Sequence, residues 1–583
     1  MSDLSVNNDG PRAVSFEPNG TGYIRKNIIK IHPKVKVIFL GGLNQIGKNI
    51  TLFEYNNEIF ILDCGMAFPD SEMFGIDLVI PDFSYLVSNK NKISGLIVTH
   101  GHEDHIGAIP YLLNKINIPI YGTALTIGLI QSKLKERRML GNAKLNTITV
   151  GQSIILGNFK IEFIHVNHSI PDAVGLAIHS PAGIIVHTGD FKIDCTPARG
   201  EMIDLAKFAE FGKRGVLALM ADSTNADRDG YTATEKIINQ SFENLFQKAG
   251  NKRIVIATFA SNIGRIKQII DCAIKYKRKV AFSGRSMLNY IAIAKQLNYI
   301  EVPDAVIIDI ELVTKYTYSE IVLVSTGSQG EPMSALYRMA YSEHKKITVG
   351  PNDFIIISAT PIPGNEKTVN SIINELMKLG CEVIHESMYE IHVSGHACQE
   401  ELKIIHGLVK PKYFIPVHGE FKHLRKHAEI AKNMGTPSEN IYVGNSGDVI
   451  EISQKGIKKV SEITLEPIYV DGSGVGDVGS IVLNDRKHLG QDGLIVSVVT
   501  LNRADKHIVS GPDIVSRGFV YVKESEKLIR EARYTVTKAI EFCIAQNTKD
   551  WNNIRTKIRD DLYKLFYSRT KRNPVILPVI MEV

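Results

Sequence analysis

The stretch THGHEDHIG, residues 99–107, follows the apolar run GLIV and decides the fold class. Four metal-ligand side chains stand close together in it: His100, His102, Asp104 and His105. Imidazole and carboxylate ligands suit a divalent ion such as zinc, and two histidines two positions apart at a strand end can converge on one ion. The Asp-His pair can serve a second ion. Histidine is sparse elsewhere, 18 in 583 residues, so a solvated polar loop is a poor explanation of this cluster.

Three later strand ends carry further candidate ligands. His168 falls in FIHVNHSIPD, Asp190 in GIIVHTGDFKID and His418 in KYFIPVHGE. Each residue alone is more often a hydrogen-bonded structural residue than a ligand. Together they repeat one pattern, in which an apolar strand delivers a His or an Asp into a short loop. Rigid scaffolds commonly carry their chemistry in such loops, so we expect these residues to complete two metal sites.

These residues resemble the metallo-β-lactamase superfamily, whose motif His-x-His-x-Asp-His precedes separate His, Asp and His ligands. The resemblance implies an α/β fold, the αββα sandwich, with two Zn²⁺ per subunit and Mn²⁺ or Mg²⁺ as alternatives for turnover. It assigns His100, His102 and His168 to one ion, Asp104, His105 and His418 to the other, and Asp190 to both. Asp63, in IFILDCG, matches the first acidic motif and would orient a ligand histidine; the residues alone allow a turn cap equally well.

A two-metal site favours hydrolysis, because two ions lower the pKa of a shared water and stabilise charge on the attacked and leaving oxygens. Redox chemistry is less expected here. The flavin-linked di-iron members of the superfamily have an acid at the position of His102.

The stretch between Asp190 and His418 is far longer than a simple metallo-β-lactamase fold needs, so we expect an inserted domain. Its strings LMADSTNA, IATFASNIGRIKQI, VSTGSQGEPMSAL and HVSGHACQEEL resemble the β-CASP insertion of nucleic-acid-processing nucleases. More narrowly, the chain resembles the ribonuclease J family, from about residue 33 to 583.

The resemblance also implies roles around the scissile phosphate. His396, in SGHA, would stabilise the leaving or transition-state oxygen. The residues that would receive phosphate are Ser261, Asn262, Arg265, Arg285 and Ser394. Ordinary turn chemistry is the alternative for the Ser and Gly runs. Relatives carry a histidine where this chain has Gly264, so sensing of the 5′ end is expected to be weaker or to depend on Arg265, Ser394 and His396.

Length and composition set the domain prediction. A chain of 583 residues with 44% hydrophobic residues can bury more than one core, and its length predicts two to four domains. The predicted order is a disordered leader (1–32), the first part of the metallo-β-lactamase domain (33–214), the β-CASP domain (215–368), a return segment (369–450), a linker (451–475) and a small α+β C-terminal domain (476–583).

Charge and cysteine usage bound the partners and the compartment. The net charge of +6 permits RNA binding without proving it. A basic cluster, Lys133, Lys135, Arg137 and Arg138, could line an RNA groove or form one solvated helix face. The six cysteines form no CxxC pair, so neither a disulfide framework nor a thiolate zinc site is indicated. With no apolar run long enough for a bilayer, a cytoplasmic protein is expected.

The sequence therefore predicts a zinc-dependent ribonuclease, a 5′-to-3′ exonuclease that can also cut internally, in mRNA decay and rRNA maturation. Asp190 would hold the ions and take a proton, and His396 would assist the departing 3′ oxygen. The expected partners are RNA with a 5′ monophosphate and further copies in a homodimer or homotetramer, with a paralogue or other RNA-decay proteins as additional candidates. Two alternatives stay open. One is a DNA-processing β-CASP nuclease, because phosphate contacts carry little information about the sugar. The other is a non-catalytic partner subunit, although such subunits tend to lose metal ligands.

Overall fold

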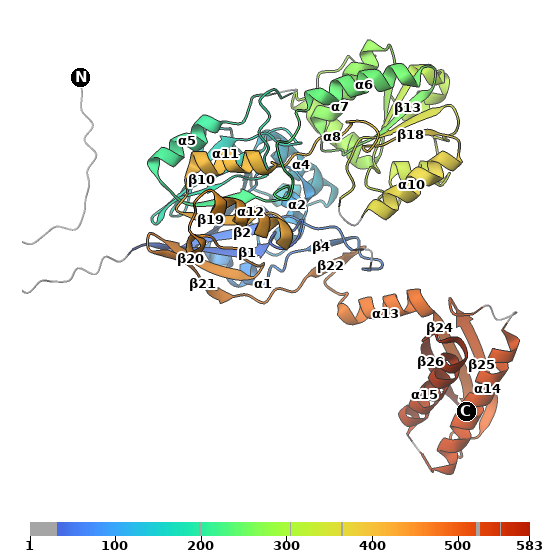
Figure 1. Cartoon of the computed structure of the whole chain (residues 1–583). Helices are drawn as coiled ribbons and strands as arrows, with labels where there is room; N and C mark the ends of the chain where they lie inside the picture. Colours follow the sequence, from blue (N-terminus) through green and yellow to red (C-terminus); the bar gives the residue numbers. More distant parts are fainter. Residues whose placement is uncertain are drawn as a thin grey trace, which may run out of the picture.

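The structure is a computed structural model that describes residues 32–70, 72–197, 200–303, 305–362, 365–520, 525–548 and 550–583. The expected leader, residues 1–32, lies outside this part of the chain except for His32. Figure 1 shows a two-sheet sandwich, a second α/β body beside it and a separate C-terminal body. In the described ranges no helix has the length and apolar character needed to cross a membrane.

The sandwich consists of two facing sheets. The first has the order β21 (Gly456–Glu462), β20 (Asp448–Ser453), β1 (Lys34–Gly41), β2 (Ile50–Tyr55), β3 (Glu58–Leu62), β5 (Ile93–Ile97), β6 (Ile120–Gly122) and β7 (Leu145–Thr147). The second has the order β19 (Tyr413–Val417), β12 (Val216–Asp222), β11 (Gly183–His187), β10 (Val174–Ser180), β9 (Phe159–His165) and β8 (Ser153–Leu156).

Apolar side chains from both sheets fill the space between them. The Phe53 and Phe60 rings stack at 4.8 Å, and Phe159 from the other sheet meets Phe60 edge-on at 5.0 Å. The outer faces carry helices, with α4 (Ala124–Glu136) over one sheet and α5 (Leu205–Arg214), α11 (Gln399–Val409) and α12 (Phe421–Asn433) over the other. Central strands are therefore buried on both faces and read as continuous apolar runs. The predicted αββα sandwich is confirmed.

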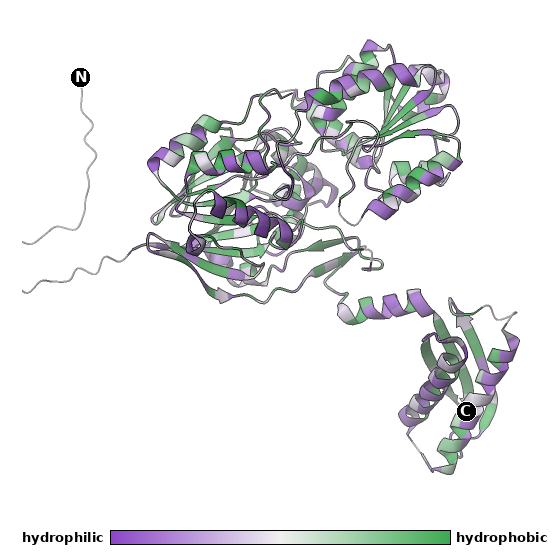
Figure 2. Ribbon diagram, in the orientation of Figure 1, coloured by the Kyte–Doolittle hydropathy of each residue, from purple (hydrophilic) through white to green (hydrophobic). Residues whose placement is uncertain are grey.

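The inserted body is a parallel sheet between helices. Its order is β15 (Ile307–Ile308), β14 (Lys279–Ser283), β16 (Ile321–Ser325), β13 (Arg253–Ala257), β17 (Asp353–Ile357) and β18 (Glu382–Ile384). Its helices are α6 (Lys236–Ala249), α7 (Ile263–Lys275), α8 (Arg285–Gln296), α9 (Ala335–Ala340) and α10 (Glu366–Lys378). Figure 2 shows the strands in the green of hydrophobic residues and purple on the outward helix surfaces. The sheet is thus covered on both faces, as parallel sheets require.

Several strands belong to a different sheet from the one that the expected domain boundaries imply. β12, expected within the insertion, pairs with β11 and β19 in the sandwich. β18, expected in the return segment, extends the inserted sheet beside β17. The expected linker 451–475 contains β21, which pairs with β20, and β22 (Ile468–Asp471), which pairs with β4 (Leu78–Ile80). Buried strands look alike in sequence, and only their pairing partners assign them to a sheet.

The C-terminal body begins after α13 (Ser480–Asp492), a helix with no buried residue. It contains β24 (Leu494–Leu501), β25 (Ile508–Arg517), β26 (Val575–Glu582), α14 (Glu526–Ala545) and α15 (Trp551–Thr570). β24 lies between the other two strands, antiparallel to β25 and parallel to β26. Buried residues of α14 and α15 form one core with this sheet, so the predicted small α+β domain is confirmed.

Candidate metal centre

The candidate ligands meet at one edge of the sandwich, where strands from both sheets end. His100 and His102 follow β5, and His102 is the N-cap residue of α2 (Glu103–Ile106). Asp190 follows β11, and His418 follows β19. Because β11, β12 and β19 run parallel, their carboxyl ends lie side by side at this edge. Residues distant in sequence are brought together by this arrangement of strands.

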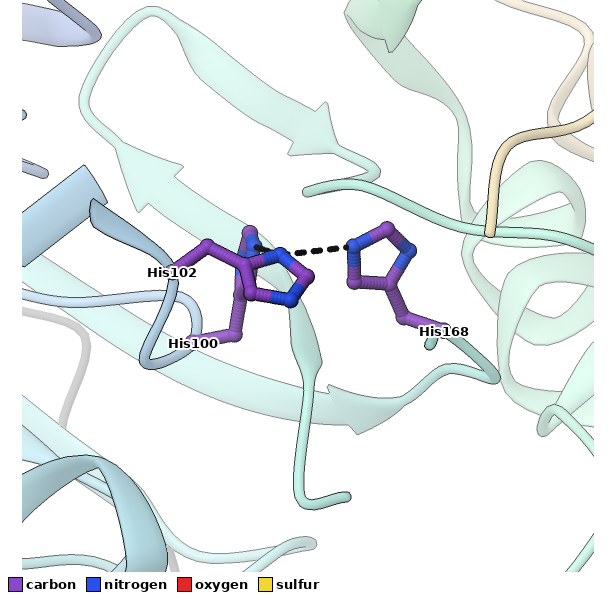
Figure 3. A group of neighbouring side chains, drawn as sticks. All are labelled: His100, His102 and His168. Atoms are coloured by element: carbon purple, nitrogen blue, oxygen red, sulfur yellow. Dashed lines mark hydrogen bonds between the residues drawn. The ribbon is translucent and has the colours of Figure 1, made fainter. Parts of the chain in front are cut away.

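His100, His102 and His168 form the first group of candidate ligands. Figure 3 shows the three rings turned toward one another. His102 Nδ1 lies 3.0 Å from His100 Nε2 and 3.1 Å from His168 Nε2. Burial lowers the pKa of His100 and His168 well below the ordinary value and that of His102 to about 4. Neutral imidazoles with converging lone pairs are the form that binds a metal ion.

The second group contains Asp104, His105, Asp190 and His418. Asp104 Oδ2 lies 3.2 Å from His418 Nε2, and Asp190 Oδ2 lies 3.2 Å from His105 Nε2. The same Asp190 oxygen is 3.6 Å from His100 Nε2, in the first group. Burial alone would raise the pKa of Asp190. The nearby His418 and His105 outweigh this effect and hold the pKa well below its usual range. One ionised oxygen thus lies between the two groups.

Fixed partners hold the ring nitrogens that face away from these groups. His168 Nδ1 donates to the Gly395 carbonyl at 2.8 Å, and His105 Nδ1 lies 2.8 Å from Asp63 Oδ2. His418 Nδ1 lies 2.7 Å from Thr224 Oγ1. Such partners set the tautomer and ring direction of metal-binding histidines. The donor set therefore fits borderline-soft divalent metal ions. Asp63 thus contacts the side of the His105 ring that faces away from the metal groups.

Asp222 and Asn49 belong to the site although the sequence analysis did not single them out as functional. Asp222 ends β12, and its Oδ2 lies 2.7 Å from His396 Nδ1. Asn49 Nδ2 donates to the Asp104 carbonyl at 3.0 Å and lies 3.1 Å from His105 Nε2. The position of Asp222 in LMADSTNA, after an apolar strand, is the same signal that identified Asp190. Asn49 carries no comparable signal, because it precedes its strand.

His396 lies beside the metal groups. Its ring is 5.0 Å from the His168 ring and 5.5 Å from the His418 ring. Burial lowers the pKa of His396, but the Asp222 carboxylate raises it more, so the net pKa lies above the ordinary value. The side chain remains 19% exposed, so it can still meet a substrate. A protonated imidazole here can donate to a developing oxyanion.

The phosphate-binding candidates differ in their surroundings. Ser394 lies close to His396, whose backbone N–H donates to the Ser394 Oγ at 3.2 Å. Ser261 is half-buried in the turn before α7, and Asn262 caps that helix by accepting from the Arg265 N–H at 2.9 Å. Arg285 is exposed at the first position of α8. Ser394 is thus the candidate whose contact with the metal-centre region is direct.

The expectation that Arg265 binds phosphate is wrong in this structure. The side chain is fully buried, and its Nη1 donates to Ser358 Oγ and to the Ile391 carbonyl, each at 2.7 Å. Its Nη2 donates to Glu235 at 2.8 Å. The apolar face of α7, with its isoleucines, turns this residue into the core. Arg265 instead links α7 to the neighbouring segments.

Two cations of the basic cluster have local partners. Lys133 pairs with Glu103 at 2.6 Å, and the Arg137 guanidinium lies 4.2 Å from the Tyr111 ring centroid. These contacts favour the alternative of a structural helix face for at least this part of the cluster.

The fold and the ligand set define a metallo-hydrolase of the metallo-β-lactamase superfamily. Family models match in the same order along the chain. They are described as the metallo-beta-lactamase superfamily (residues 44–220), the ribonuclease J beta-CASP domain (251–376), the Zn-dependent metallo-hydrolase RNA specificity domain (382–443) and the ribonuclease J C-terminal domain (481–583).

Sequence relatives agree with these models. The chain is 42% identical to ribonuclease J2 of Bacillus subtilis over 94% of its own length and 99% of the relative. It is 42% identical to ribonuclease J 1 of Streptococcus pyogenes, with 94% and 98% covered, and 40% identical to ribonuclease J 2 of Staphylococcus aureus, with 95% and 100% covered. The chain belongs to the ribonuclease J family. It is accordingly an enzyme, a metal-dependent nuclease that hydrolyses RNA.

A solved structure shares the fold. A protein of unknown function from Enterococcus faecalis superposes with a TM-score of 0.51 at 16% identity, covering 72% of this chain and 100% of that one. At this identity the similarity concerns the fold alone.

Proposed function

We propose that this chain is a zinc-dependent ribonuclease that removes nucleotides from RNA 5′ ends and also cuts internally. The observation that carries the proposal is the position of Asp190 Oδ2 between two groups of candidate ligands, with His396 beside them. His100, His102 and His168 would hold one zinc and Asp104, His105 and His418 the other. When bound, the two ions would activate a water and balance charge on the phosphate.

The surrounding side chains would complete the chemistry. His396, which is oriented by Asp222 and whose pKa that carboxylate raises, would donate a proton to the departing 3′ oxygen. Asp190 would accept a proton from the attacking water, and each product would carry a 5′ phosphate. Ser394 would donate a hydrogen bond from its hydroxyl to the terminal phosphate of the RNA. The oriented His396–Asp222 pair supports this division of roles.

The wider role is proposed from the resemblance to the ribonuclease J family. We propose action in the cytoplasm, in mRNA decay and rRNA maturation, by a homodimer or homotetramer, with a paralogue or other RNA-decay proteins as candidate partners. The ribonuclease J names of relatives matching nearly the whole chain support an RNA substrate.

The test is digestion of one RNA with a 5′ monophosphate, the same RNA with a 5′ triphosphate, and a matched DNA. The protein is loaded with zinc or manganese, and its metal content is measured in parallel. We expect two zinc ions per chain and mononucleotides from the monophosphate RNA. His102→Ala is expected to lose zinc and cleavage together.

Other outcomes would redirect the assignment. Equal internal cutting of both RNAs would make the protein an endonuclease, and preferential cutting of DNA would support the DNA-processing alternative. A zinc-loaded protein that cleaves none of the three substrates would fit the partner-subunit alternative.

A further inference from the structure

Glu401 is a buried carboxylate at the third position of α11, and it receives backbone donors from three loops. Its Oε1 accepts from the Ile193 N–H at 2.7 Å. Its Oε2 accepts from the Thr232 N–H at 2.6 Å and the Cys398 N–H at 2.8 Å. The residue has no exposed surface. Both oxygens are therefore engaged, and each bond is charge-assisted, which makes it shorter and stronger than a bond between neutral groups.

The three loops all lead to the candidate metal centre. Ile193 follows Asp190 by three residues, and the Lys192 N–H between them donates to the carbonyl of Asn167, the neighbour of His168, at 2.8 Å. Cys398 follows His396 by two residues. Glu401 thus connects the loop that carries the shared ligand with the loop that carries the candidate acid.

The third loop closes the connection at His396. The Thr232 Oγ1 donates to the His396 carbonyl at 2.7 Å, and Asn225 Nδ2 donates to the same carbonyl at 3.0 Å. The Thr232 side chain thus fixes the backbone of His396, while the Thr232 backbone is fixed by Glu401. A shift of Glu401 would move His396 relative to Asp190, although the Glu401 side chain itself contacts none of the candidate metal ligands.

We propose that Glu401 is a positioning residue for RNA hydrolysis, which sets the distance between His396 and the metal groups by binding the three loops to one carboxylate. The inference rests on the proposed function, in which His396 assists the leaving oxygen. Small displacements of such groups lower the rate steeply, because the reaction depends on near-attack geometry. Substrate binding depends on other residues and is expected to change little.

Glu401→Gln is the sharpest test, because the amide has the same shape but only one accepting oxygen for donors on both sides. The expected result is a fall in kcat of about 10- to 100-fold with KM changed less than about threefold. Zinc affinity, measured by competition with a chromophoric chelator, is expected to stay at the wild-type value. The matched control is Glu400→Gln, whose side chain is 41% exposed and pairs with Lys403.

A second variant keeps the proposal testable if Glu401→Gln does not fold. Thr232→Val removes the hydroxyl bond to the His396 carbonyl and leaves the backbone bond to Glu401 intact. It is expected to lower kcat in the same direction by a smaller factor. The probe is a fluorescent 5′-monophosphorylated RNA, followed in single-turnover and steady-state reactions.

The outcomes separate this inference from the proposed function. If the wild-type protein does not cleave the RNA, the proposed function fails. If the wild type cleaves and folded Glu401→Gln keeps the wild-type kcat, the positioning role is wrong. A parallel loss of zinc affinity and kcat would also overturn it, because Glu401 would then act through the ligands.

Discussion

Three of the candidate ligand histidines divide their two ring nitrogens between a metal group and a fixed partner. His105, His168 and His418 direct Nε2 to the groups and Nδ1 to a carboxylate, a carbonyl and a hydroxyl, respectively. His396 follows the same design, with Nδ1 against Asp222. The partner, rather than the histidine alone, therefore determines which nitrogen is available.

Replacing the partner of His396 tests this relation. In Asp222→Asn the charge that raises the pKa of His396 is removed, so the ring is less often protonated and less well oriented. We expect kcat to fall about 10- to 100-fold in single-turnover cleavage. Asp227→Asn is the control, since its carboxylate lies on the same loop, 43% exposed and 3.5 Å from His423. Wild-type kcat in Asp222→Asn would contradict the prediction.

Gly264 offers a test of 5′-end sensing. A Cβ at this position would meet only Asn262 Oδ1, at 3.7 Å, so the first atom of a side chain fits without displacement. Gly264→His is expected to leave stability unchanged or raise it by a few tenths of a kcal/mol, because glycine is a poor helix former. The ratio of monophosphate to triphosphate RNA cleavage is expected to rise about tenfold. Gly264→Ala, which adds no donor, should keep the ratio of the wild type.

The buried His406 is expected to make the stability of the protein sensitive to acid. Burial lowers its pKa to about 4, and its Nε2 lies 2.8 Å from Thr436 Oγ1. The unfolded chain, with a pKa near 6.5, binds a proton at pH values where the folded protein does not. Stability is therefore lost as pH falls from about 6.5 to 4, by about 3 kcal/mol from this residue.

In His406→Gln, the new side-chain amide can still bond to the Thr436 hydroxyl, and the titratable imidazole is removed. Between pH 7 and pH 4.5, the free energy of unfolding measured in urea is expected to fall by about 2–3 kcal/mol less in the variant than in the wild type. The exposed His488→Gln on α13 is the control and should follow the wild type. Equal acid sensitivity of His406→Gln and the wild type would rule out His406 as the source.

At the scale of elements, α8 of the inserted body and the segment just after it contact both loops of the first ligand group. The Tyr290 hydroxyl donates to the carbonyl of Gly101, between His100 and His102, at 3.4 Å. Just beyond the helix, the Tyr299 hydroxyl donates to Asp172, which follows His168 in the chain and has a positive φ of 64°. A non-glycine residue in this conformation is held there by its contacts. The inserted body therefore helps to shape the metal centre.

Tyr299→Phe removes one of these contacts. Zinc affinity is expected to fall about tenfold, because the His168 loop loses a partner that fixes it. Competition with a chromophoric chelator measures the change. Tyr276→Phe is the matched control, since the Tyr276 hydroxyl donates to the Glu243 carbonyl, 3.1 Å away, inside the inserted body. Identical zinc affinities would show that the Tyr299 contact does not support the ligands.

Elements were predictable from sequence where a local pattern is sufficient, and their pairing was not. The alternation of apolar strands and helices predicted the sandwich and the insertion. Ala218 of β12 pairs with Tyr413 of β19, 195 residues later, and β18 pairs with β17 across one helix. No local pattern encodes these partners. In the same way, the strand-end pattern drew attention to Asp190 and His418, while the inward direction of Arg265 depended on the packing of α7.

At the scale of the whole molecule, the hydrophobic cores divide the chain. The core of the C-terminal body, with Ile495, Val536 and Phe566 among its members, contains only residues of that body. The candidate ligands lie entirely within the sandwich. Metal binding should therefore stabilise one part of the protein and not the other.

Calorimetry of the zinc-loaded and chelated protein tests this division. We expect two transitions, of which chelation lowers only the one from the catalytic part. Zinc at 100 times its dissociation constant adds about 2.7 kcal/mol to the folded state. A shift of both transitions by the same amount would show that the two parts unfold together.

The separation of the ligands along the chain has a consequence for biosynthesis. Asp104 and His418 lie 314 residues apart. At roughly 5–20 residues per second, a ribosome needs about 15 to 60 seconds between them. β1 also waits for β20, near residue 450, to cover its edge. The growing polypeptide therefore cannot hydrolyse RNA until about 450 of its 583 residues have been made.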